Sequence, residues 1–149
     1  MKSPTFSVTT IIYYKMPTTT HMLSAIPKTV DNDASAVICI LFGSAAADAL
    51  RADSDVDIAV LLRAVMTLEE RASLVTRFQK QLHREVDLVD LSVTSGALLK
   101  QILTKGIVVT KKDPRAYAEL IKRMIYNQED YMPYFRRALK ARRERFLNG

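Results

Sequence analysis

The sequence predicts one domain with an α+β fold, and three observations support this fold class. The run Ala36–Phe42 is continuously apolar, as in strands that are buried on both faces of a sheet. Several segments further along the chain have helical periodicity and begin at good capping residues. With 149 residues, of which 48% are hydrophobic, the chain is long enough for one core and too short for two ordinary domains.

The N-terminal region shows no sustained periodicity over residues 1–21, so we expect a poorly structured extension there. The folded domain would then comprise residues 22–149, including the C-terminal helices. A short amphipathic segment over residues 22–26 and a polar loop over residues 29–35 are expected to precede the first strand.

Capping and turn residues divide the centre of the chain into alternating elements. Thr67 and Glu70 form a capping-box pattern that starts one helix, whereas Ser95 starts another that Gly106 ends. Helices are expected over residues 45–50, 67–82 and 95–105. Strands are expected over residues 36–42, 55–62, 85–91 and 107–110.

The longest predicted helix begins at Asp113, a good N-cap, and Pro114, which suits a first turn. Pro133 predicts a kink or a break within it. An apolar stripe at helical spacing is expected to pack on the sheet, with a partner protein as the alternative. The stripe comprises Tyr117, Leu120, Ile121, Met124, Ile125, Tyr131, Met132, Phe135, Leu139 and Phe146.

The positive charge of the chain is concentrated near its C-terminus. Residues 1–110 carry eleven Lys and Arg against eleven Asp and Glu, whereas residues 111–149 carry eleven against five. Such a segment is most often a solvated helix, and it also suits an acidic protein surface. We do not expect direct binding of nucleic acid.

The sequence also bears on the compartment of the protein. No apolar run is long enough to cross a bilayer, so no membrane association is expected. The single cysteine, Cys39, lies in the first apolar strand and is interpreted as a small buried hydrophobe, which suits a reducing compartment. We therefore expect a cytoplasmic protein.

Two polar motifs border the first two strands. Asp55 and Asp57 flank one apolar residue, so in a strand their carboxylates would project from the same side and repel each other. A hard divalent cation, Mg²⁺ first of all, would relieve that repulsion. Gly43 and Ser44 end the preceding strand and could cradle a phosphate through backbone N–H groups and a hydroxyl. The alternatives are a plain turn and a solvated strand edge.

Asp87 is a candidate for a third carboxylate ligand beside Asp55 and Asp57. It lies in an apolar strand, where burial of an unpaired carboxylate would be costly. Asp90, expected on the opposite strand face, is its rival, and Glu85 is a weaker one. His83 is interpreted as a surface residue at a helix end rather than as a catalytic base.

The order of an apolar residue with Gly43 and Ser44, then ten residues, then Asp55 and Asp57 resembles the signature of the polymerase-β nucleotidyltransferase superfamily. With the third acidic strand, the chain resembles the minimal nucleotidyltransferases, which are often encoded beside a HEPN-domain toxin as its antitoxin. The resemblance implies a mixed sheet with helices packed on one side, followed by a long C-terminal helical segment.

The resemblance also implies a mechanism and a set of partners. ATP would be the donor, with two Mg²⁺ ions. Gly43 and Ser44 would bind the triphosphate, Asp55 and Asp57 both metal ions, and Asp87 the metal ion that activates the acceptor. The expected partner is a HEPN toxin in a hetero-oligomer, with a homodimer as a further possibility.

One departure from the family pattern concerns the residues after Ser44. The family usually has a small residue and then Ala-Arg-Gly, whereas this chain has Ala45, Ala46, Ala47 and Asp48. Loss of the arginine at position 47 predicts weaker nucleotide binding, unless Arg51 reaches the same space.

Three functions follow as hypotheses. The chain could transfer AMP to a hydroxyl, most plausibly of tyrosine, on a HEPN toxin. It could modify a small molecule such as an aminoglycoside, although such enzymes usually carry an additional substrate domain. It could instead be an antitoxin that only masks its partner, with a vestigial nucleotide site.

Overall fold

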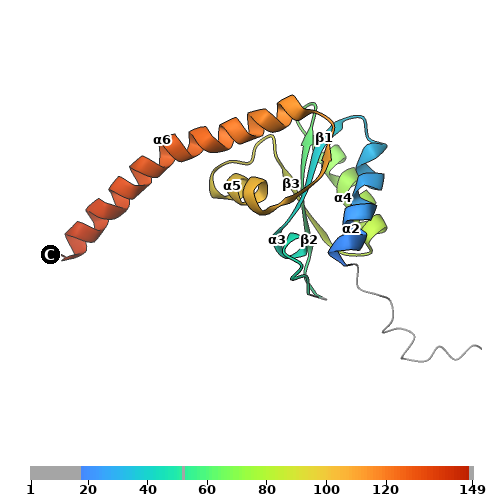
Figure 1. The fold of residues 1–149 in the computed structure, drawn as a ribbon, viewed down its shortest axis with the longest axis horizontal. Coiled ribbons are helices and arrows are strands. Elements are labelled where there is room, and N and C mark those ends of the chain that lie inside the picture. Colours follow the sequence, from blue (N-terminus) through green and yellow to red (C-terminus); the bar gives the residue numbers. More distant parts are fainter. Residues whose placement is uncertain (1–17, 52, 148–149) are drawn as a thin grey trace, which may run out of the picture.

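The fold is organised around a four-stranded mixed sheet, seen edge-on in Figure 1. The computed structural model describes residues 18–51 and 53–147. The strands are β1 (Ala36–Phe42), β2 (Val56–Leu62), β3 (Val86–Asp90) and β4 (Ile107–Lys111). Their order in the sheet is β3-β2-β1-β4. β1 runs antiparallel to both of its neighbours, whereas β2 and β3 are parallel. The four predicted strands and the mixed sheet are therefore confirmed.

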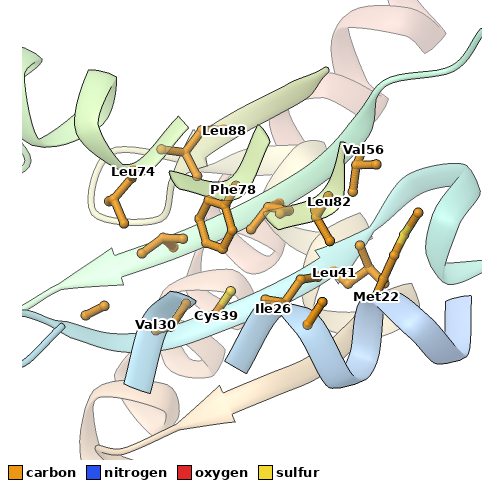
Figure 2. Close-up of a cluster of buried hydrophobic side chains, with 14 of the residues drawn as sticks. Met22, Ile26, Val30, Cys39, Leu41, Val56, Leu74, Phe78, Leu82 and Leu88 are labelled. Atoms are coloured by element: carbon orange, nitrogen blue, oxygen red, sulfur yellow. The ribbon is translucent and has the colours of Figure 1, made fainter. Parts of the chain in front are cut away.

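Helices cover both faces of this sheet, and not one face only as expected. All seven residues of β1 are buried. Because side chains alternate along a strand, an apolar strand of this kind needs cover on both sides. Cys39 and Leu41 pack toward α2 (Thr19–Asp31) and α4 (Leu68–Leu82), as Figure 2 shows. Ile40 and Phe42 belong to a second cluster, with residues of α5 (Gly96–Lys105) and α6 (Pro114–Leu147).

Local signals explain several helix ends. At the start of α4, the Glu70 backbone N–H donates to Thr67 Oγ1 at 3.1 Å, and the Thr67 N–H donates to Glu70 Oε2 at 2.8 Å, so the predicted capping box is confirmed. At the start of α6, Asp113 Oδ1 accepts from the N–H groups of Arg115 and Ala116, at 3.0 and 3.1 Å.

Two helices differ from their predicted bounds. The first described helix, α2, runs from Thr19 to Asp31, so it begins before residue 22 and includes the start of the expected polar loop. The early start has a local cause, because the Thr18 hydroxyl accepts from the His21 N–H at 3.3 Å and caps the helix. The late end has a tertiary cause, because Lys112 Nζ donates to the carbonyls of Val30 and Asp33, at 2.8 and 2.9 Å. α3 spans only Gly43–Ala46, where a helix over residues 45–50 was expected.

The C-terminal helix α6 is continuous through Pro133, so the expected break is absent. Its 34 residues correspond to roughly 51 Å, and Figure 1 shows its second half extending beyond α5, away from the sheet. Leu120 is buried, and Tyr117 and Met124 pack on the same cluster, as predicted for the stripe. Ile125 was expected in the stripe as well but is 45% exposed, so the buried face is narrower than predicted. The stripe side chains from Tyr131 onward lie outside the described residues, as do residues 1–17.

Two further predictions concern burial and the membrane. Cys39 is fully buried, and burial raises the pKa of its thiol far above the usual value, so it is an inert core residue. Within the described ranges, no helix combines the length and the apolar character needed to span a bilayer.

Candidate functional site

The two predicted motifs meet at one end of the sheet. β1 ends at Phe42, whose Cα partner in β2 is Asp57, and Asp57 is in turn the partner of Asp87 in β3. In parallel neighbouring strands, partners of this kind project from the same face of the sheet. The end of β1 and the beginnings of β2 and β3 therefore place Gly43, Asp57 and Asp87 side by side.

Gly43 is in direct contact with the Asp57 carboxylate. A Cβ atom at position 43 would lie 2.1 Å from Asp57 Oδ2 and 3.0 Å from its Cγ, which no real side chain can tolerate. Gly43 also has φ +67°, a left-handed backbone conformation that disfavours other residues. The glycine of the Gly-Ser motif thus leaves the space that the central carboxylate occupies.

The three predicted carboxylates interact electrostatically. Burial, the negative charge of Asp87 and then that of Asp55 together raise the pKa of Asp57 above its ordinary value. Asp57 is half-buried, whereas Asp55 and Asp87 are exposed. The expected burial cost at Asp87 is therefore absent, because β3 is an edge strand. Asp87 stays a candidate ligand because it is the register partner of Asp57.

The rival residues serve other roles. Asp90 is in register with Val60, which belongs to the opposite face of the sheet, and its Oδ1 accepts from the Ser92 N–H at 2.8 Å. Glu85 Oε2 accepts from the side-chain amide of Gln79 at 2.7 Å. His83 is an exposed residue that ends α4 with φ 52°, in agreement with the surface interpretation.

The donor set fits a hard cation that has further oxygen ligands. Among the described residues, no group of three or more His, Cys, Asp or Glu side chains could hold a metal ion by itself. The charges of Asp55 and Asp87 nevertheless make the electrostatic potential at Asp57 more negative, and the missing Cβ of Gly43 leaves room for the Asp57 carboxylate. Mg²⁺ is commonly bound by one or two carboxylates together with phosphate oxygens and water. An ion bridging these residues and a triphosphate would match this pattern.

The segment after Gly43 is a single tight turn of helix. Ser44 is half-buried, and its carbonyl accepts from the Ala49 N–H at 2.9 Å, whereas Ala47 is exposed. Asp48 has φ 54°, which explains why the resembled family has glycine at this position and why α3 ends early. The Thr19 hydroxyl lies 2.7 Å from the Ala45 carbonyl and 3.0 Å from Asp48 Oδ1, so it stabilises this turn from α2.

Sequence reasoning missed Arg84 as a residue that positions the site. Its guanidinium donates to the carbonyls of Arg51 and Ser54, at 2.5 and 2.7 Å, and so holds the turn that leads into Asp55. The available signal was its position between α4 and β3, directly before the acidic strand. The side chain of Arg51 is exposed, and its suggested role at the phosphates stays a prediction.

Comparison with protein families gives one matching description, "Polymerase beta, Nucleotidyltransferase", over residues 24–115. Among curated proteins, the protein adenylyltransferase MntA of Shewanella oneidensis is 33% identical over 90 residues, or 59% of this chain. The match spans 65% of the length of that relative.

Solved structures show similar folds over most of the chain. One is a toxin–antitoxin structure with AMP-PNP, which is 26% identical over 85% of this chain and 95% of that chain, with a TM-score of 0.60. Another is the tri-AMPylated Shewanella oneidensis HEPN toxin in complex with MNT antitoxin, at 25% identity, 87% and 96% coverage and a TM-score of 0.54.

Proposed function

The chain belongs to the polymerase-β nucleotidyltransferase family, and on this basis we propose that it transfers AMP from ATP to a tyrosine hydroxyl of a HEPN toxin and so acts as an antitoxin. The resemblance to this family, based on the Gly-Ser and Asp-x-Asp motifs, is confirmed. The similar proteins support the finer proposal, since one is a protein adenylyltransferase and another is bound to an AMPylated HEPN toxin.

One observation carries the assignment to transfer chemistry. Asp57 is the register partner of both Phe42, which directly precedes Gly43, and Asp87, and its carboxylate fills the space beside Gly43, which supports a common site for the predicted phosphate-binding turn and the predicted metal ligands. In the proposed mechanism, Gly43 and Ser44 bind the triphosphate. Asp55, Asp57 and Asp87 would hold two Mg²⁺ ions, which supply neutralisation of the phosphate charge and activation of the acceptor.

The remaining work of the protein in this mechanism is positioning. The acceptor oxygen forms a bond to the α-phosphorus, the bond to the bridging oxygen breaks, and pyrophosphate leaves while the hydroxyl proton passes to water. The exposed Asp87 stands at the open edge of the site, where an acceptor would approach. Because in-line attack needs only an aligned hydroxyl, docking must select the acceptor. We expect this reaction in the cytoplasm, which supplies ATP.

The test mixes the purified chain with the HEPN-domain protein encoded beside it, in the presence of ATP and Mg²⁺. Intact mass spectrometry should show additions of whole AMP units to the partner. Additions should be absent with Asp57→Asn, with a chelator, or with an ATP analogue that has a non-cleavable bridge between its α- and β-phosphates. Absence of a neighbouring HEPN-domain gene would contradict the proposed partner.

A second function, antitoxin action by masking alone, is favoured by the alanine at position 47, where the resembled family has arginine. A tight complex that neutralises the toxin without any change in its mass would support masking. Transfer to an aminoglycoside, with none to the HEPN protein, would support the small-molecule alternative.

A further inference from the structure

The sheet face that carries Asp57 also has a groove at its other end. A groove of about 440 Å³ lies between β2 and the first half of α6. Its lining includes Leu61, Glu119, Leu120, Lys122, Arg123 and Tyr126. Leu61 is four residues beyond Asp57 in the same strand, so both side chains project from the same face, roughly 13 Å apart.

Large apolar side chains are exposed on the groove and in the segments beside it. Tyr126 is 62% exposed and Ile125 is 45% exposed on α6, and Val93 is 74% exposed in the loop after β3. Arg123 joins these two segments, because its guanidinium donates to the carbonyls of Leu91 and Ser92, in the latter case at 2.9 Å. Hydrogen bonds from a groove residue thus fix α6 against the loop after β3. Exposed apolar side chains gathered at one place are typical of a protein-binding surface.

Beyond the groove, α6 continues as a basic arm, which we define as residues 133–144. Its described side chains include five exposed basic residues, Arg136, Arg137, Lys140, Arg142 and Arg143, and one exposed acidic residue, Glu144. Figure 1 shows that this part of α6 projects past α5. The segment from residue 111 onward contains the whole positive excess of the chain. An arm of this kind attracts an acidic surface and repels a second copy of itself.

We propose that the groove and the basic arm together form the docking surface for an acidic face of the protein that carries the acceptor hydroxyl. This proposal rests on the proposed function for the identity of its occupant. The groove and Asp57 lie on the same face of the sheet, so a partner seated on the groove is on the side of the sheet that carries the site. A surface at this position explains how the chain selects an acceptor although its carboxylates recognise only phosphate and metal.

The test compares three variants of the full chain with the wild type. Tyr126→Ala alters the groove, and Arg136→Glu with Lys140→Glu reverses charge on the arm. The matched control, Lys28→Glu with Lys80→Glu, makes the same charge change on α2 and α4, which cover the opposite sheet face. Thermal melting checks that each variant is folded.

Calorimetry without ATP measures the Kd for the neighbouring HEPN-domain protein, so binding is scored separately from transfer. We expect the Kd to rise at least tenfold in the groove and arm variants and to stay within twofold in the control. Added salt should weaken wild-type binding more than binding of the arm variant. In transfer assays, the KM for the partner should rise while kcat stays within twofold.

Other outcomes separate this proposal from the proposed function. A wild-type chain that binds the partner but transfers no AMP contradicts the enzymatic function, whereas a tenfold loss of binding in the variants still supports the docking surface. Unchanged Kd values in both variants would overturn it, as would a wild-type chain that does not bind. A wild-type homodimer that the variants dissociate, with partner binding intact, would assign the surface to a second copy instead.

Discussion

Replacing Gly43 by alanine tests whether the close contact between the Gly-Ser turn and Asp57 controls the site. The new Cβ would lie 2.1 Å from Asp57 Oδ2, so the carboxylate must move by more than 1 Å to reach an ordinary contact of about 3.4 Å. A misplacement on the order of 1 Å can cost about 100-fold in rate. The left-handed backbone adds a stability cost of about 1–2 kcal/mol, or roughly 2–8 °C in melting temperature.

Gly96 provides a matched control for this experiment. It has φ +61°, so alanine there meets the same backbone strain, but no atom lies within 4 Å of the added Cβ. Both variants should therefore lose the stability due to backbone strain, measured by calorimetric melting, and Gly43→Ala should lose more because it also displaces the carboxylate. Only Gly43→Ala should lose about 100-fold in AMP transfer at saturating ATP and Mg²⁺. Transfer by Gly43→Ala within threefold of Gly96→Ala would refute the reasoning.

Three further predictions address charge. Asp57→Asn should abolish transfer but raise the melting temperature of the metal-free protein at neutral pH. Burial and the neighbouring carboxylates raise the pKa of Asp57, so its ionised form destabilises the folded state. This gain should vanish as the pH falls through that raised pKa, and a lower melting temperature at pH 7 would contradict it. Ala47→Arg should tighten ATP binding by about 1 kcal/mol, measured by calorimetry. An unchanged affinity would mean that another basic side chain already contacts the ATP phosphates. At Asp33, burial favours the neutral acid, but hydrogen bonds from Ser35 and Arg77 and the charge of Arg77 outweigh it and lower the pKa from 3.8 to about 2. Asp33→Asn should therefore reduce the free energy of unfolding at pH 7 by on the order of 1 kcal/mol after allowance for solvent screening, and the difference in urea midpoints should shrink between pH 4 and pH 2.

Much of the fold could be predicted because its signals are local. Thr67 and Glu70 mark the start of α4 by themselves, and the apolar run in β1 identifies the central strand. These two features depend on spacings of a few residues, which sequence shows directly. Asp87 was a candidate because a third ligand was expected, whereas its pairing with Asp57 came only with the strand register.

The features that sequence reasoning missed depend on distant contacts or on solvent. Lys112 lengthens α2 from about eighty residues away, and Arg84 holds a turn more than thirty residues earlier. Pro133 removes one backbone hydrogen bond from α6 without ending the helix, and its position is exposed to water, which sequence does not show. The exposure of Asp87 depends on the edge position of β3, which requires the strand order.

The edge position of β3 has a consequence for solubility. The unpaired backbone groups of an edge strand can pair with another molecule and start aggregation. Charged side chains on the strand, or partners for those backbone groups, prevent this. Here Asp87 and Asp90 place a negative charge on each face of β3. The guanidinium of Arg71, which is in α4, donates a hydrogen bond to the backbone carbonyl of Leu88 in this strand. The same carboxylate proposed for chemistry would thus also keep copies of the chain apart. Inactive variants that neutralise both acids should aggregate faster at high concentration than Asp57→Asn, because Asp57 lies on an interior strand.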